Sequence, residues 1–523
     1  MGIYLNPGND GFRKSLNSQI YVDKSGLIEY TNSVVDTEQG YICISRPRRF
    51  GKTYAAKMLS AYYDCSVDSS DLFDNLEISK SKSYKKHLNK YNVINLNIQT
   101  FLSSAEDKNN VTGYLQFKVI NELKRVYKEI VDDDIKILSE ALELVYNSER
   151  KKFIFIIDEW DSILRENKED KELQNKYLDF LRNLLKDRNY VGLVYMTGIL
   201  PIKKYGTHSA LNMFDEFSMI RMREFSKYTG FTEEEVKALC KYYKMDFNEM
   251  SKWYNGYVIN DYHIYNPKSV VDSLRSKIFD TYWTSTETYE ALKIYINMNF
   301  DGLKEKIIKL LSGYNVRINT RSFQNTMSDF NNVDDILTLL VHLGYLGYNI
   351  ETKEVFIPNK EIREEFEVSV ENSNWESVIS SIKKSEMLLN YTLNEESEKV
   401  SEIIDEIHVG NTSILNYNDE NSLSCVINLA YYSAKNYYDV YRELQSGYGF
   451  SDIIFIPKKN VFKKAIVVEL KWDKDAKTAI DQIKNKKYTN ALKSYKGEIL
   501  LVGINYNKET KKHECVIEKI KKN

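Results

Sequence analysis

The chain has 523 residues, 42% of them hydrophobic and 28% charged, and its formal net charge is -2. This composition is typical of a globular protein and excludes a chain that is mainly disordered, while a length of this size indicates about three domains. No apolar run approaches the roughly 20 residues that cross a bilayer, and the N-terminus lacks the features of a signal peptide. No two cysteines form a CxxC pair. We therefore expect a cytoplasmic protein without a membrane partner.

The charge is unevenly distributed along the chain. Residues 411–523 hold 20 Lys and Arg against 13 Asp and Glu, a net charge of +7, so the remainder carries -9. A basic region on an acidic body favours a polyanion partner, although solvated surface lysines would give the same count. We therefore expect a nucleic acid partner, with DNA favoured and RNA left open.

Strands and helices alternate in the first part of the chain. Apolar runs predict strands at 41–45, 93–98, 153–158 and 191–198, and helical periodicity predicts helices at 52–64, 112–149 and 171–188. Strands that alternate with helices indicate an α/β domain with a parallel sheet.

The pattern changes further along the chain. A mainly helical stretch is followed by a helix and two short strands of the size of a winged-helix unit, then by a charged helical connector. The last part reads as an α+β unit in the order helix, strand, strand, helix, strand, strand. We predict five regions: an α/β P-loop domain (1–231), a helical lid region (232–325), a winged-helix-like region (326–370), a helical connector (371–410) and an α+β domain (411–523).

A glycine-containing loop follows the first predicted strand. The sequence SRPRRFGKT matches the P-loop pattern GxxxxGK[ST], except that Arg46 occupies the position of the first glycine. We expect Gly51 to let the loop approach a phosphate, Lys52 to reach the β- and γ-phosphates, and Thr53 to bind Mg²⁺. The alternative is an ordinary helix start with an exposed lysine.

A second polar group supports the same interpretation. The strand at 153–158 ends in Asp158 and Glu159, as a Walker B element does. Asp158 would hold Mg²⁺ and Glu159 would polarise the attacking water, while Thr197 would contact the γ-phosphate or the water after the strand VGLVYM. Acidic residues at a turn and a threonine at a strand end are the structural alternative. Together with the P-loop, these residues predict a site for ATP and Mg²⁺.

Four arginines are candidates for stabilising the transferred phosphoryl group, namely Arg48, Arg49, Arg221 and Arg223. We include Arg49 among the residues that bind the nucleotide. The sequence leaves the choice among the four open, and each could instead lie at the surface or in a salt bridge.

Another group of charged residues lies in the basic C-terminal region. Two strands joined as a hairpin carry Asp452 on the first strand and Glu469 and Lys471 on the second. Because side chains alternate along a strand, Glu469 and Lys471 should share a face, with Asp452 beside them. Asp452 and Glu469 would hold Mg²⁺ against a phosphodiester, and Lys471 would act on the water and the developing charge. Glu420, which opens the preceding helix, is a further candidate ligand. An exposed charged hairpin is the alternative.

Both halves of the chain resemble one family, the bacterial AAA-ATPase-like proteins fused to a C-terminal PD-(D/E)XK nuclease-superfamily domain. The resemblance rests on the segments YVDK, SRPRRFGKT, TGILPIKK, WYNGY, YNP, YNDENSLSCVI and QSGYGFSD with VELKW. It implies a P-loop that tolerates the missing first glycine, and it supports Glu420 as a site residue.

These patterns predict an ATP-binding and ATP-hydrolysing domain coupled to a magnesium-dependent nuclease. One alternative is an ATP-dependent switch whose nuclease-like domain only binds nucleic acid or a partner. Another is a nucleotide-binding scaffold that does not hydrolyse ATP because Arg46 distorts the loop. A homo-oligomer is compatible with each of these alternatives.

Overall fold

The chain divides into two compact units in the computed structural model. One comprises Met1–Thr288 and Arg317–Glu364, and the other comprises Tyr289–Val316 and Glu365–Asn523. The five finer regions expected from the sequence stay predictions. The structure describes residues 2–202, 211–221, 225–259, 262–283, 289–298, 300–324, 327, 330–371, 375–411, 420–442, 453–458, 461, 463–485, 492 and 495–522.

A five-stranded parallel sheet forms the centre of the first unit. Its strands lie in the order β2-β3-β4-β1-β5 and are β1 (Tyr41–Ser45), β2 (Asn92–Asn97), β3 (Phe153–Asp158), β4 (Val191–Gly198) and β5 (Asp215–Phe217). Every residue of β3 and β4 is buried, as in parallel sheets that are covered on both faces. The predicted α/β class is confirmed, and β5 is a short strand that the sequence pattern did not indicate.

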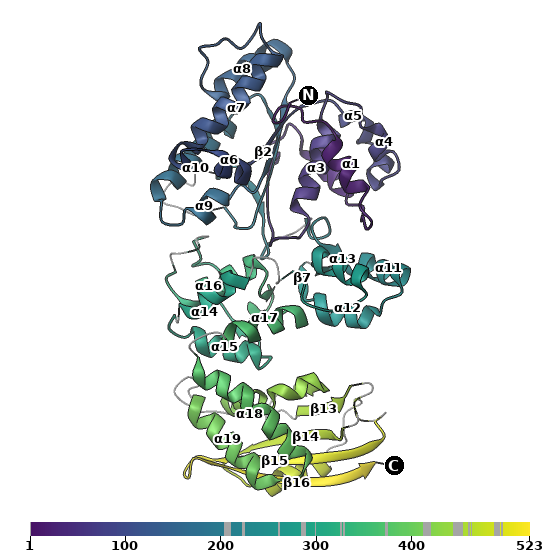
Figure 1. Cartoon of the computed structure of the whole chain (residues 1–523), viewed down its shortest axis with the longest axis vertical. Coiled ribbons are helices and arrows are strands. Elements are labelled where there is room, and N and C mark those ends of the chain that lie inside the picture. The colour runs from purple at the N-terminus through teal and green to yellow at the C-terminus, as the bar shows by residue number, and fades with distance from the viewer. Residues whose placement is uncertain are drawn as a thin grey trace. The chain divides into compact units, whose positions relative to one another are not determined.

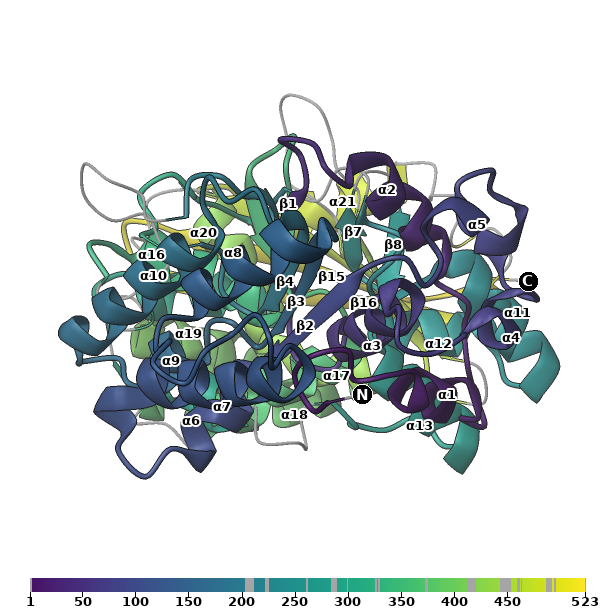
Figure 2. The ribbon, with the colours of Figure 1, turned by 90° about the horizontal axis from the view of Figure 1, so that it is seen from above.

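Helices cover both faces of this sheet. In Figures 1 and 2, α1 (Asp10–Leu16) and α3 (Lys52–Tyr63) lie on one side, and α7 (Val111–Val126), α8 (Leu138–Glu149) and α10 (Lys171–Leu185) lie on the other. The connection from β1 runs to the far edge at β2, and the chain then returns through β3 and β4 toward β1. Right-handed crossovers in opposite directions place their helices on opposite faces. The direction in which the crossover connections run along the sheet reverses between β1 and β4. In open α/β sheets, ligands bind at such a position, at the carboxyl ends of the strands.

Shorter elements complete the first unit. A small antiparallel sheet packs with α11 (Glu233–Tyr243), α12 (Phe247–Tyr254) and α13 (Pro267–Ser276) around a shared apolar core, and α16 (Val333–Leu343) precedes a hairpin as predicted. The remaining strands are β6 (Phe231–Thr232), β7 (Tyr257–Ile259), β8 (Tyr262–Tyr265), β10 (Gly347–Asn349) and β11 (Glu354–Phe356), and the remaining α-helices are α2 (Gly26–Val34), α4 (Ser70–Phe73), α5 (Tyr84–His87), α6 (Ile98–Ser104) and α9 (Ser162–Glu166).

A mixed sheet of order β12-β13-β14-β15-β16 forms the centre of the second unit. Its strands are β12 (Tyr438–Arg442), β13 (Ile453–Pro457), β14 (Ala465–Trp472), β15 (Gly497–Asn507) and β16 (Lys512–Lys522). Only β14 and β15 pair in parallel, so a crossover is needed between them, and α21 (Ala476–Asn485) supplies it. The predicted α+β order is confirmed, except that β12 is an additional strand.

Helices α18 (Glu376–Leu393) and α19 (Ser397–Asn411) pack together beside this sheet (Figure 1). The unit also contains α14 (Tyr289–Asn297), α15 (Leu303–Leu311) and α20 (Glu420–Ala430), while α17 (Lys360–Glu371) and β9 (Val316–Arg317) lie where the chain passes between the units. Among the helices that the structure describes, none is both long and apolar enough to cross a bilayer.

Candidate active sites

The loop between β1 and α3 has a shape that requires glycine. Gly51 has φ +86°, in the left-handed region that side chains disfavour, and a Cβ added there would meet no atom within 4 Å. Lys52 follows as the first residue of α3 and is buried. Its Nζ donates hydrogen bonds to the carbonyl oxygens of Arg46 and Pro47, each at 3.0 Å. The loop therefore holds the ammonium group at the carboxyl end of β1 and leaves open space on the outer side of Gly51.

Arg46 does not enter that open space. Its side chain is fully buried, and its Nε donates to Thr229 Oγ1 at 2.9 Å while Nη1 donates to Met219 Sδ at 3.1 Å. Burial lowers the pKa of the Arg46 guanidinium to about 9. The arginine at the first glycine position thus packs inside the unit, behind the loop.

The end of β3 brings three predicted site residues together. Thr53 Oγ1 donates to Asp158 Oδ2 at 2.8 Å, and Thr197 Oγ1 donates to Asp158 Oδ1 from the neighbouring strand β4. Hydroxyl and carboxylate oxygens are the ligands that Mg²⁺ prefers. Thr53 and Asp158 therefore fit a magnesium site at the mouth of the loop.

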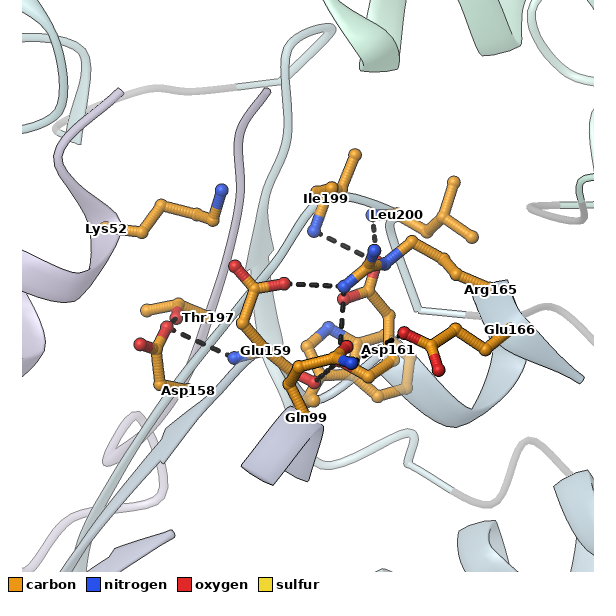
Figure 3. Close-up of polar contacts among 12 residues, drawn as sticks. Lys52, Gln99, Asp158, Glu159, Asp161, Arg165, Glu166, Thr197, Ile199 and Leu200 are labelled. Carbon is orange, nitrogen blue, oxygen red and sulfur yellow. Dashed lines mark hydrogen bonds and ion pairs between the residues drawn. The ribbon is translucent and has the colours of Figure 1, made fainter. Parts of the chain in front are cut away.

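Glu159 lies between two cations. Figure 3 shows its carboxylate between the Lys52 ammonium and the Arg165 guanidinium, and Arg165 Nη2 donates to Glu159 Oε2 at 2.6 Å. Burial raises the pKa of Glu159, against the opposing charges of Lys52 and Arg165. Burial also lowers the pKa of Lys52, against the charges of Glu159 and Asp158. The two groups thus stabilise each other's ionised forms.

Two residues that the sequence patterns did not indicate, Arg165 and Asp161, complete this network. Arg165 Nε lies 3.1 Å from Asp161 Oδ2 in an i,i+4 pair, and the same oxygen accepts hydrogen bonds from the backbone N–H groups of Ile199 and Leu200. The i,i+4 spacing of opposite charges was a usable signal for the ion pair. The hydrogen bond from Arg165 to Glu159 depends on the turn after β3, and hydrophobic periodicity does not predict the shape of a turn.

A cavity of about 1140 Å³ opens over the loop, within the first unit. It is lined by Lys52, Thr53 and Glu159 and by apolar side chains of the N-terminal segment, α3 and α13, among them Ile20, Tyr21, Val22, Met58 and Val271. Arg48 and Arg49 line it as well, whereas Arg221 is exposed elsewhere and Arg223 lies outside the described residues. The volume slightly exceeds the usual range of small-molecule sites, so it has room for a nucleotide.

A substitution at Gly198, the last residue of β4, tests how tightly this site is packed. A Cβ at Gly198 would lie 2.6 Å from two indole atoms of Trp160 and 2.8 Å from Asp161 Oδ1. Because Trp160 is fully buried, Gly198→Ala should lower the free energy of unfolding by about 1–3 kcal/mol. Urea denaturation of the full chain measures this. Gly11→Ala is the control, since its Cβ would meet only Lys57 at 3.6 Å, and equal midpoints for both variants would contradict the expected crowding.

In the second unit, β14 presents two predicted residues on one face. Lys471 Nζ donates to Glu469 Oε1 at 2.8 Å, and the two side chains are only 3% and 0% exposed. Ile453, which follows Asp452 in the sequence, pairs with Val468, which precedes Glu469. Asp452 lies outside the described residues, and of Glu420 the structure describes only its place as the first residue of α20. In the part of the chain that is described, no group of three or more His, Cys, Asp or Glu forms a metal site.

Comparison with known proteins agrees with both halves of this description. Residues 10–207 match the family described as "Predicted AAA-ATPase", and residues 418–515 match the PD-(D/E)XK nuclease superfamily. The chain therefore carries an N-terminal domain of the first family and a C-terminal domain of the second. This confirms the resemblance inferred from the motifs.

A curated relative adds no assigned activity. The chain is 25% identical over 276 residues to the "Uncharacterized protein in vnfD 5'region" of Azotobacter chroococcum mcd 1, and the aligned part covers 51% of each chain. The chain thus spans about half the length of the curated relative it matches.

Proposed function

We propose that this protein hydrolyses ATP in its first unit and cleaves nucleic acid, with DNA favoured, in its second. The family matches support the two general classes, a predicted ATPase and a nuclease-like domain. The observation that carries the nucleotide assignment is the hydrogen-bonded group of Thr53, Asp158 and Thr197 beside the buried Lys52 ammonium. ATP and Mg²⁺ are the proposed cofactors.

Each residue of the first site has a role in this proposal. The Lys52 ammonium and the amino end of α3 attract phosphate oxygens, and the open side of Gly51 allows them to approach the backbone. Thr53 and Asp158 offer oxygens to Mg²⁺, which supplies charge neutralisation when bound. Glu159 accepts a proton from the attacking water, and Thr197 holds Asp158 in place. The apolar wall of the cavity, which includes Ile20 and Val271, is suited to a flat nucleobase.

The second site supports metal-dependent phosphodiester cleavage. Glu469 is a buried carboxylate beside a buried ammonium, so it can share a metal ion with further acidic side chains while Lys471 offsets its charge. Lys471 would then act on the attacking water and on the charge that develops at the phosphate. Asp452 and Glu420 are the proposed further ligands. We also propose a cytoplasmic location, because the four described cysteines Cys43, Cys65, Cys240 and Cys515 are free thiols.

The proposal is tested with the full-length protein in two assays. Phosphate release from ATP in Mg²⁺ should exceed the uncatalysed background, and plasmid, linear DNA and RNA should be compared as cleavage substrates with Mg²⁺ or Mn²⁺. A protein that releases no phosphate would contradict the first half of the proposal. A protein that leaves all three nucleic acids intact would contradict the second half.

Salt dependence tests the proposed nucleic acid partner. The net charge of +7 over residues 411–523 should bind backbone phosphates and release their counterions. We expect the DNA affinity of the full chain to fall by about 10³-fold or more between roughly 50 and 200 mM salt if about six phosphates are contacted. Fluorescence anisotropy with a labelled duplex measures this. An affinity that does not change over that range would contradict an electrostatic interface.

A further inference from the structure

A line of buried contacts connects the segment after β4 to Glu159. The backbone N–H groups of Ile199 and Leu200 donate to Asp161 Oδ2 at 3.0 and 2.8 Å. The same oxygen lies 3.1 Å from Arg165 Nε, and Arg165 Nη2 donates to Glu159 Oε2 at 2.6 Å. Figure 3 shows these groups gathered around the Arg165 guanidinium and the Asp161 carboxylate. Asp161 is fully buried and Arg165 is 8% exposed, so the contacts are shielded from water.

The arrangement leaves one oxygen of Glu159 on the side away from Arg165. Among the described residues, no hydrogen bond to Glu159 Oε1 is found, and Glu159 lines the cavity over the loop. The charged groups that face Glu159 are Lys52 from α3, Asp158 from β3, and Asp161 and Arg165 from the following turn and α9. Arg165 is the only one of these four that is hydrogen bonded to the Glu159 side chain in the described structure.

Glu159 also adopts a backbone conformation that needs support. Its φ is +53°, in the left-handed region that is unfavourable for a residue with a side chain. The turn is held by Ser162, whose N–H and Oγ both donate to the Glu159 carbonyl oxygen, while Ser162 Oγ accepts from Arg165 Nη2 at 3.1 Å. The same guanidinium group therefore contacts both the carboxylate and the turn that carries it.

We propose that Arg165 is the positioning residue for Glu159. It binds one carboxylate oxygen, so that the other faces the cavity as the proton acceptor, and Asp161 fixes the guanidinium relative to the backbone at residues 199–200. This inference rests on the proposed ATP hydrolysis. Arg165 acts through Glu159 and is not assigned a contact with the nucleotide.

Steady-state ATP hydrolysis by the full chain provides the first test. Arg165→Gln should lower kcat by about 10- to 100-fold because Glu159 loses its orientation, whereas KM should stay within about threefold because Lys52 and Thr53 are unchanged. Arg165→Lys keeps the positive charge and should therefore show a smaller loss of kcat than Arg165→Gln. Arg182→Gln, on the exposed side of α10, is the control.

Thermal unfolding of the nucleotide-free protein provides a second test that does not depend on activity. Glu159→Gln, Arg165→Gln and the double variant form a double-mutant cycle. Near neutral pH, the loss of Tm on changing Arg165 should be smaller in the Glu159→Gln background than in the wild-type background.

The outcomes separate this inference from the proposed function. If the wild type releases no phosphate from ATP, the proposed function fails and this inference fails with it. If the wild type hydrolyses ATP but Arg165→Gln keeps its kcat, only the positioning role is overturned. Equal Tm losses in the two backgrounds would also overturn it, whereas a lower kcat at a nearly unchanged KM together with a non-additive cycle supports it.

Discussion

Replacing Lys52 by alanine should reduce ATP hydrolysis at least about 100-fold, because the phosphates lose the cation that the loop holds in place. The Lys52 ammonium is buried with two backbone carbonyl partners and lies close to Glu159 and Asp158. The charges of these carboxylates favour the ammonium form, against the burial that lowers the pKa of Lys52. Without it, the phosphate groups of ATP would approach the two carboxylates with no compensating charge from this position.

The measurement is phosphate release together with calorimetric binding of ADP in Mg²⁺. Lys57→Ala is a matched control, because Lys57 is an exposed lysine on the same helix α3. Glu159→Gln should differ from Lys52→Ala by retaining nucleotide binding while turnover falls by about 10²- to 10⁴-fold. Turnover by Lys52→Ala at the rate of the Lys57→Ala control would show that the P-loop assignment is wrong.

Replacing Lys471 by alanine should abolish nucleic acid cleavage, with a loss of about 100-fold or more. The variant also leaves Glu469 as a buried charge without this partner, and breaking a buried ion pair costs about 3–5 kcal/mol. Loss of cleavage must therefore be separated from loss of folding. The double variant Glu469→Gln with Lys471→Met removes both charges, so it should recover much of the stability and still not cleave.

Cleavage of plasmid DNA in Mn²⁺ and thermal unfolding are measured for both variants. Lys474→Ala, at an exposed position shortly after β14, is the control and should cleave normally. Because residues that act as a unit are not additive, combining Asp452→Asn with these changes should add little further loss. ATP hydrolysis should persist in every folded variant, since the proposed ATP site lies in the other unit. Normal cleavage by the stable double variant would contradict the nuclease assignment.

The sequence predicted those parts of the fold that have strong local signals. Buried parallel strands read as continuous apolar runs, so β3 and β4 were found with their observed bounds. Helix α3 was found from its apolar periodicity. By contrast, β5 and the strands β6 to β8 have two to four residues each, too few to show a period of two.

In the candidate site, too, the residues with a local sequence signal could be predicted, and the contacts between distant residues could not. The motif residues Lys52, Thr53 and Asp158 could be named because a strand end and a helix start place them at one edge of the sheet. The buried position of Arg46 could not be predicted, because its partners Thr229 and Met219 are distant in sequence. The hydrogen bond from Arg165 to Glu159 likewise depends on the left-handed backbone conformation of Glu159, which no residue type in this segment predicts.

Nucleic acid cleavage by the full-length protein, measured with and without ATP, tests the central claim most directly. Wild type, Lys52→Ala and Lys471→Ala are incubated with plasmid DNA in Mg²⁺ or Mn²⁺, and the fraction cut is followed over time. We predict that the wild type cleaves DNA at a rate that depends on ATP and that Lys471→Ala does not cleave. Cleavage by Lys52→Ala should be the same with and without ATP. If the wild type leaves the DNA intact under every condition while still hydrolysing ATP, the ATP-regulated nuclease is contradicted and a non-cleaving ATP-dependent switch becomes the better account.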